Sequence, residues 1–249
     1  MKNKIYYLIV LGMITIFFAS CNQADYLPCV KPSGEVVEEL RATEPFTGIS
    51  LYSHAKVYIV QGSENSVRVE AAPNIQDHIE VYTSGNTLYI DNTRCLRTRA
   101  DEVKIFIATP TITSVGLSGS GYVYLEEGFT GEHLHLALSG SGKLSAEPVH
   151  FQEIEIGLSG SGNITVKGTV QKEAIAISGS GNVNGSLLES EQAFVKITGS
   201  GNAKVFVNEF LDARIAGSGN IWYWGSPEIN MNIAGSGAIH YAGHDDVAE

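Results

Sequence analysis

The sequence predicts an all-β protein, folded as a right-handed parallel β-helix-like solenoid of about seven coils. Three observations lead to this prediction: a five-residue phrase ending in Gly-Ser-Gly occurs seven times, its copies lie 18 to 21 residues apart, and apolar residues alternate with polar or small ones between them. A fixed period near twenty residues is typical of a solenoid, in which each copy is one coil stacked on the last. Alternation with period two is typical of strands with one buried face. The right hand follows from the strong preference of parallel β crossovers.

Each phrase is expected to form a tight corner of its coil, with three short strands per coil. Two glycines around one serine suit such a corner, because glycine tolerates positive φ and has no side chain to collide with the next coil. Equivalent residues of successive coils would then form columns, about 4.8 Å apart from residue to residue. An asparagine follows four of the phrases and predicts an outward ladder of side-chain amides, formed by Asn163, Asn182, Asn202 and Asn220.

Residues 44–115 lack the phrase, but they keep the alternation of strands. Within them, Ser84-Gly85-Asn86 is expected to join strands 79–83 and 87–91 as a hairpin. We interpret this region as an irregular β cap, continuous with the repeat solenoid of residues 116–243 and followed by a tail at 244–249. A separate small β domain is the alternative interpretation.

The chain begins with a pattern typical of a bacterial lipoprotein signal peptide. Lys2 and Lys4 precede an apolar run over residues 5–18, and small residues then lead to Cys21. The run is short for a membrane-spanning helix. We therefore expect a signal peptide over residues 1–20, lipidation of Cys21, a tether over residues 21–43, and a location at the outer membrane on either of its faces. An ordinary signal peptide or a membrane anchor is the alternative.

Charge and cysteine content narrow the classes of partner. Loss of Lys2 and Lys4 with the signal peptide would lower the formal net charge from −11 to −13, which argues against nucleic acid and against electrostatic docking on anionic lipid. Cys29 and Cys95 would remain, an even number in an oxidising compartment. The spacing of a single pair of cysteines is not diagnostic, so the sequence is compatible with a disulfide and with two free thiols.

The repeat region shows no convergent set of catalytic residues. Glu126 and Glu147 are expected to stack one coil apart beside Lys167, which we interpret as a solvated charged strip. The serine-rich corners contain no G-x-S-x-G elbow, and His133 with His135 lacks a third metal ligand. We therefore expect a non-enzyme without cofactor or metal. A carbohydrate-active enzyme is the alternative, because parallel β-helices also host such chemistry.

The candidate binding patch lies near the C-terminal end of the repeats. By the alternation, Trp222 and Trp224 should point outward from one strand, with Phe206 one coil earlier and His240 one coil later. Exposed aromatic rings on a flat surface suit stacking with a sugar or contact with a protein. Alternatively, the tail or a second subunit covers these rings and closes the open end of the solenoid. The expected partner is an unknown protein or glycan, and a homo-oligomer is compatible with the pattern.

The lipoprotein-like start, the segment with Phe46-Thr-Gly-Ile49 and Val57-Tyr-Ile59, and the repeated I/L-x-G-S-G-N phrase resemble the putative auto-transporter adhesin, head GIN domain family. The resemblance covers residues 44–240. It implies a right-handed parallel β-helix-like fold, a cell-envelope location and a role in adhesion, although some relatives are called lipid-binding proteins. It implies no catalytic residues. We therefore expect a non-catalytic envelope lipoprotein that acts as an adhesin or binding scaffold, with a lipid-binding envelope protein as another alternative.

Overall fold

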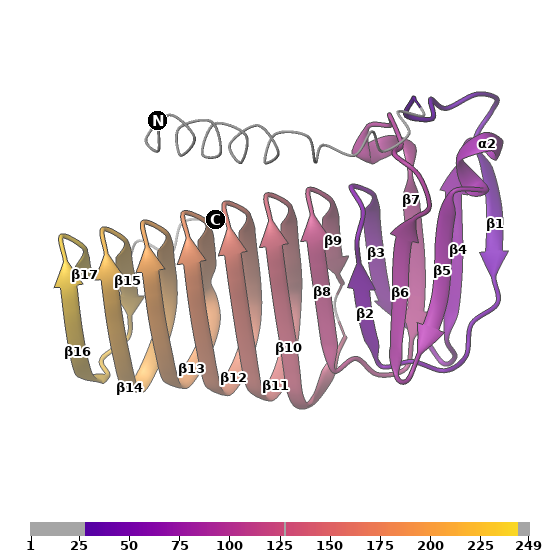
Figure 1. The fold of residues 1–249 in the computed structure, drawn as a ribbon. Helices are drawn as coiled ribbons and strands as arrows, with labels where there is room; N and C mark the ends of the chain where they lie inside the picture. Colours follow the sequence, from indigo (N-terminus) through magenta and orange to yellow (C-terminus); the bar gives the residue numbers. More distant parts are fainter. Residues whose placement is uncertain (1–27, 127, 244–249) are drawn as a thin grey trace, which may run out of the picture.

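The structure, a computed structural model, describes residues 28–126 and 128–243. Its strands form one continuous 17-stranded sheet that winds into a flattened solenoid with two long faces (Figure 1). The solenoid has about six turns with a spacing of about 20 residues, so the fold class is confirmed and the number of turns is slightly lower than expected. The predicted signal peptide and Cys21 lie outside the described residues. In the described part of the chain, no helix has the length and apolar character needed to cross a bilayer.

The coils consist of long strands that run along both faces. These strands are β10 (Thr130–Gly140), β11 (Lys143–Gly160), β12 (Asn163–Gly179), β13 (Asn182–Gly199) and β14 (Asn202–Gly217). Neighbours pair in parallel, and β11 bonds to β12 along both of its halves. The expectation of three short strands per coil was therefore wrong, because the ladder continues through the bend opposite the corner. A shift of register between Ala146 and Val149 absorbs the change of direction there.

The Gly-Ser-Gly phrases form the tight corners at the other edge, and Gly160 shows why they need glycine. Its φ is +113°, and a Cβ atom added to it would lie 2.5 Å from the carbonyl oxygen of Gly140 in the coil before. The N–H groups of Ser161 and Gly162 both donate to that same oxygen, at 2.9 Å each. The coils therefore approach so closely at the corner that no side chain fits between them.

The core consists of the inward columns of these strands. The first residue of each of the first six phrases belongs to one such column, and none of the six is more than 2% exposed: Leu117, Leu138, Leu158, Ile177, Ile197 and Ile215. Outward residues alternate with them, as in the burial pattern of β12. The predicted alternation of inward and outward residues in the repeat strands is therefore confirmed over these coils.

Shorter strands build the N-terminal end. They are β1 (Val37–Arg41), β2 (Gly48–Leu51), β3 (Lys56–Gln61), β4 (Ser66–Ala71), β5 (Ile79–Ser84), β6 (Thr87–Asn92), β7 (Lys104–Thr109), β8 (Ser114–Gly119) and β9 (Tyr122–Leu125), together with the short helices α2 (Pro73–Gln76) and η1 (Ala100–Glu102). Strands β5 and β6 form the predicted hairpin, with Ser84 opposite Thr87. Strands β2 and β3 pair directly with β8 and β9, so this end continues the solenoid.

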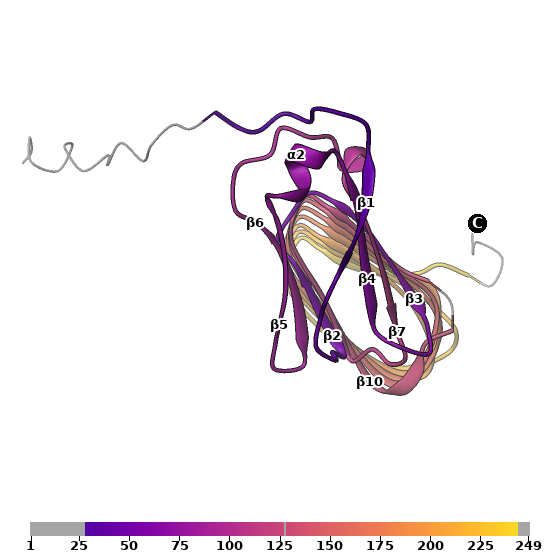
Figure 2. The same cartoon turned by 90° about the vertical axis from the view of Figure 1, so that its right-hand side faces the viewer.

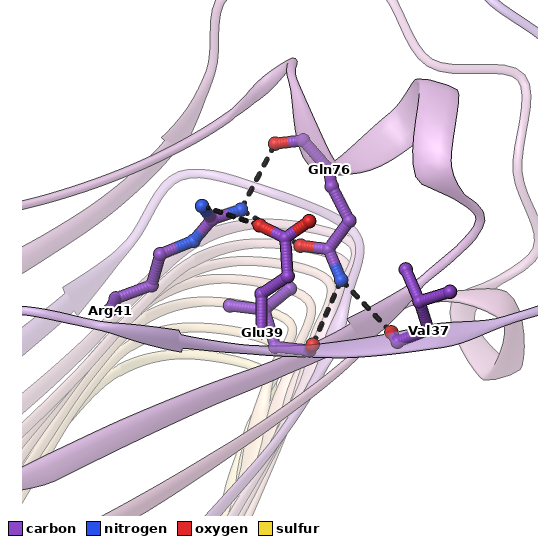
Figure 3. Close-up of polar contacts among 5 residues, drawn as sticks. Val37, Glu39, Arg41 and Gln76 are labelled. Atoms are coloured by element: carbon purple, nitrogen blue, oxygen red, sulfur yellow. Dashed lines mark hydrogen bonds and ion pairs between the residues drawn. The ribbon is translucent and has the colours of Figure 1, made fainter.

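Strand β1 lies within the segment expected to be a tether and closes this end of the molecule. In Figure 2, which looks onto the N-terminal end, the later coils superimpose behind β1, β4 and α2. Arg41 of β1 donates to Gln76 Oε1 at 2.8 Å, and Gln76 Nε2 donates to the carbonyl oxygens of Val37 and Val69 at 3.0 and 2.9 Å (Figure 3). A disulfide between Cys29 and Cys95 holds the preceding residues to the loop after β6. The chain therefore provides its own cap at the N-terminal end.

The C-terminal end consists of β15 (Asn220–Trp224), β16 (Glu228–Gly235) and β17 (Ala238–Tyr241). Strand β16 pairs with β14, and β17 pairs with β15. In the part of the chain that the structure describes, neither β16 nor β17 has a second ladder partner. This end of the solenoid is therefore open, in contrast to the N-terminal end.

Candidate functional site

One outward column runs the length of one face and is the candidate binding site. It contains eight side chains from parallel strands that neighbour one another in the sheet, each residue in register with the next: Tyr58, Tyr124, Ser145, Thr165, Asn184, Lys204, Trp222 and His240. We call this set the long column. Aromatic rings stand at both of its ends, and small or polar side chains lie between them. The five coil steps from Tyr124 to Trp222 span roughly 24 Å, at about 4.8 Å per step.

The first aromatic end is a stack of three rings. Tyr58 lies between Phe106 and Tyr124, with 5.2 Å between ring centroids on each side and an angle of 13° between planes. The Arg68 guanidinium lies over the Phe106 ring at 4.3 Å and closes that end of the stack. Ser145 follows Tyr124 in the column, and it is too small to continue the stack. The column therefore steps down at this point.

A shallow hollow of about 340 Å³ lies at this step. Its lining residues are Tyr58, Tyr124, Leu125, Glu126, Ser145 and Glu147. The Ser145 hydroxyl donates to a carboxylate oxygen of Glu147 at 2.6 Å, and the Lys167 ammonium pairs with Glu147 at 2.7 Å. The predicted grouping of Glu126, Glu147 and Lys167 is therefore present. An aromatic ring beside a carboxylate acceptor and an ammonium donor can hold a hydroxyl-rich ring by stacking and hydrogen bonds together.

The second aromatic end contains part of the predicted patch. Trp222 stacks on His240 with 5.4 Å between ring centroids, and His240 is exposed. Phe206 is half-buried. Trp224 is only 4% exposed, so its prediction as an outward contact residue was wrong.

The position of Trp224 at the end of its strand explains its burial. It lies opposite Phe206 of β14 on one side. On the other side, the N–H of Ala242 donates to the carbonyl oxygen of Tyr223 at 2.9 Å, which brings the residues after β17 alongside Trp224. The usable aromatic surface at this end is therefore Trp222 with His240, and with Phe206 at its margin.

The predicted asparagine ladder runs beside the long column. Asn182 donates to Asn163 at 3.1 Å, Asn202 donates to Asn182 at 2.9 Å, and Asn220 donates to Asn202 at 3.3 Å. The side-chain amides of Asn182, Asn202 and Asn220 each donate one hydrogen bond to the coil before, so the main effect of the ladder is to make this face more rigid. It supports a flat and rigid surface under the long column.

Among the residues that the structure describes, the other polar groups suggest no second site. His133 and His135 each lie within 3.4 Å of a glutamate one coil away, Glu153 and Glu155, and the Lys172 ammonium holds the pKa of Glu153 below its usual range. Within residues 28–126 and 128–243, no group of three or more potential ligands gathers around a metal-sized space. A larger hollow of about 480 Å³ lies on the opposite face, where backbone, small side chains and serine hydroxyls form most of its lining. It offers little chemistry for recognition beyond Tyr52 at its end.

The Tyr58 and Tyr124 end of the long column was missed by sequence reasoning. Tyr124 could have been found, because it holds the same position after its phrase as Trp222 does after a later one. Tyr58 could not, because no phrase precedes it and its register with Tyr124 is set by the pairing of β3 with β9. This pairing joins residues that are far apart in the sequence.

Comparisons with known proteins agree with this architecture. A crystal structure of a putative adhesin from Bacteroides fragilis is similar with a TM-score of 0.80 and 25% identity, over 85% of this chain and 99% of that one. A putative lipid binding protein from Parabacteroides distasonis is similar with a TM-score of 0.74 and 25% identity, over 86% and 99%. A putative adhesin from the same species shares the fold, with a TM-score of 0.69 and 22% identity over 86% and 99%. Among curated proteins, none matches the chain.

The family model for the putative auto-transporter adhesin, head GIN domain matches residues 45–227. This range includes the N-terminal β region and most of the repeats, and the long column from Tyr58 to Trp222 lies within it. Membership of an adhesin family indicates a protein of the cell envelope or surface. The chain belongs to the putative auto-transporter adhesin, head GIN domain family.

Proposed function

We propose that the protein is a non-catalytic adhesin of the cell envelope that binds a glycan chain along the long column. The observation that carries the proposal is the arrangement of that column, with the Tyr124 step at one end and Trp222 at the other on a rigid, flat face. Aromatic rings separated by roughly 24 Å, five strand spacings, suit an extended ligand. The hydroxyl and amide groups of Ser145, Thr165 and Asn184 lie between them. Membership of an adhesin family supports the same class of function.

The chemistry of the Tyr124 hollow favours a neutral sugar chain. Glu147 is already paired with Lys167 of the next coil, so the two offer an acceptor beside a donor, and the second carboxylate of the hollow, Glu126, disfavours an anionic ligand. Such a pair can accept from one sugar hydroxyl and donate to another, while the Tyr124 ring stacks on the apolar face of the sugar. The strongly acidic chain would repel a polyanionic glycan.

The location we propose is the outer membrane, where the chain is held by lipid on Cys21. The support is the basic, apolar and small-residue pattern before Cys21, together with the envelope location indicated by the family. Attachment by lipid leaves the solenoid free to present its face to a partner.

The test is binding of the purified protein to a glycan array, followed by titration of the glycans that bind. Tyr124→Ala and Trp222→Ala should each weaken binding roughly tenfold or more, about 1.4 kcal/mol, while the far-UV circular dichroism stays unchanged. Tyr82→Ala is the matched control, because Tyr82 is an exposed aromatic residue on β5, away from the column. Its glycan affinity should equal that of the unmodified protein.

Two results would contradict the proposal. One is full glycan affinity in both the Tyr124 and the Trp222 variant. The other is turnover of a polysaccharide by the purified protein that a single change, such as Glu147→Gln, abolishes. The second result would make the protein an enzyme and Glu147 a candidate catalytic group.

A further inference from the structure

The last coil exposes apolar side chains at positions that are buried or half-buried in the earlier coils. Met231 and Ile233 are 62% and 39% exposed, whereas Ala213 and Ile215, their register partners on β14, are at most 2% exposed. Tyr241 of β17 is 57% exposed. These residues continue the inward columns of the earlier coils. The apolar surface that they expose is therefore the uncovered end of the hydrophobic core. A solenoid end of this kind requires a cover.

Strands β16 and β17 also present free backbone edges of unusual composition. Proteins normally protect such edges with charged residues, as β1 does here with Glu38, Glu39 and Arg41. In β16 and β17, by contrast, Glu228 is the single residue among Asp, Glu, Lys and Arg. An almost uncharged end on a chain with net charge −11 is suited to meeting an equally acidic molecule without repulsion.

We propose that this end docks onto the same end of a second copy, forming a two-fold symmetric dimer. The N-terminal end is a poor partner for it, because that end is covered by its own elements and has charged edge strands. The residues that follow in the sequence, 244–249, carry three acidic side chains and so are a poor match for an apolar surface. The remaining match on a second copy is its own open coil, which is self-complementary by symmetry.

The alternation of inward and outward residues defines the register in which β16 pairs with β16 of the second copy. Two-fold symmetry makes the two β16 strands antiparallel, and each inward residue must face another inward residue. One symmetric register pairs all the inward apolar positions of β16: Met231 faces Met231 of the second copy, and Ile229 faces Ile233. In this register Glu228 lies opposite Ala234, so no like charges meet. The dimer would extend the hydrogen-bond ladder across the two β16 strands and cover the exposed apolar side chains of both.

Cysteine cross-linking tests this register directly. In the full chain with Cys21→Ser, Met231→Cys should form an intermolecular disulfide under mild oxidation, because directly opposed residues of antiparallel strands have Cα atoms about 4.5–5.5 Å apart. Asn230→Cys is the matched control, since it points outward and faces residue 232 of the second copy. It should stay uncross-linked. Failure of the Met231→Cys variant to cross-link, or equal cross-linking of both variants, would overturn the proposal.

The oligomeric state gives a second, independent measurement. Sedimentation equilibrium of the Cys21→Ser protein should show a dimer, and Met231→Lys should raise the dimer Kd roughly tenfold or more with unchanged circular dichroism. A lysine at this position introduces the edge charge that the native strand lacks. A Cys21→Ser protein that is monomeric at every concentration would refute the dimer. Glycan binding plays no part in either measurement, so this result is independent of the proposed function.

Discussion

The Ser190 hydroxyl oxygen lies 3.3 Å from a carboxyl oxygen of Glu173 and 2.9 Å from the carbonyl oxygen of Phe206, inside the apolar core. A hydroxyl group has one proton to donate. If Ser190 donates it to Phe206, the contact with Glu173 needs a proton from the carboxyl group. Glu173 is fully buried, and this burial raises its pKa to about 8 against the opposing effect of the Ser190 hydrogen bond. Glu173 is therefore neutral below about pH 8, and as a carboxylic acid it can supply that proton.

Because the pKa of Glu173 is raised in the folded state, we predict that the free energy of unfolding falls as pH rises. The ordinary pKa of a glutamate is 4.5, so between about pH 4.5 and 8 the folded chain holds a proton that the unfolded chain has lost. The free energy of unfolding should decrease over this window by up to about 1.4 kcal/mol per pH unit. It should level off above the folded pKa, where both states are ionised. Urea unfolding at a series of pH values measures this slope.

The variant Glu173→Gln isolates the contribution of this group. Its amide can still donate to Ser190, but it does not titrate, so the part of the slope due to Glu173 should vanish. Glu155→Gln serves as control, because Glu155 is an exposed acid of the neighbouring coil and its removal should leave the slope in place. A slope that persists unchanged in Glu173→Gln would assign the pH dependence to other groups.

The alternation of the repeat strands predicts two classes of substitution with different costs. Ile164 is fully buried and its neighbour Thr165 points outward. Ile164→Ala should lower the free energy of unfolding by about 2–5 kcal/mol, as large-to-small core changes generally do. Thr165→Ala should change it by no more than about 0.5 kcal/mol. Equal shifts in denaturant unfolding would contradict the assignment of the two faces.

The repeat solenoid could be predicted because its signals are local. Five consecutive residues specify each Gly-Ser-Gly corner. The alternation of apolar and polar residues then predicts which side chains of the adjoining strands point into the core and which point to solvent. The alternation alone also predicted an outward Trp222, and in the structure this residue is half-buried and stacks on the exposed His240. The alternation failed for Trp224, because the burial of this residue depends on the path of the chain after β17, which no local pattern records.

The N-terminal region was harder to predict because its contacts are distant in the sequence. Strand β1 binds β4 and α2 through Arg41 and Gln76, which are 35 residues apart. A single pair of cysteines could not decide between a disulfide and free thiols, and the structure joins Cys29 to Cys95 across 66 residues. Tyr58 of the long column depends on long-range pairing in the same way. Sequence reasoning therefore identified one end of the candidate site and missed the other.

The proposed lipid anchor makes a prediction about cell fractions. Cys21→Ser removes the thiol that would carry the acyl chains, so the mature protein should move from the membrane fraction to the soluble fraction. Cys95→Ser is the matched control, because this cysteine lies in the solenoid cap and its variant should stay with the membrane. Membrane association that survives Cys21→Ser would contradict lipid anchoring through this residue.

The corner glycines predict a sharp contrast between two positions three residues apart. Gly160 has a φ of +113°, and an added Cβ would lie 2.5 Å from a carbonyl oxygen of the previous coil, whereas a Cβ added to Gly157 meets no atom within 4 Å. Gly160→Ala should therefore cost at least about 2 kcal/mol, because the unfavourable backbone conformation and the collision add together. Gly157→Ala should change stability by less than about 1 kcal/mol, since its column already holds alanine at residues 137 and 176. Denaturant unfolding of both variants measures the difference. Similar stability of the two would mean that coil spacing at the corners can relax, and that the glycine column does not set the separation between coils.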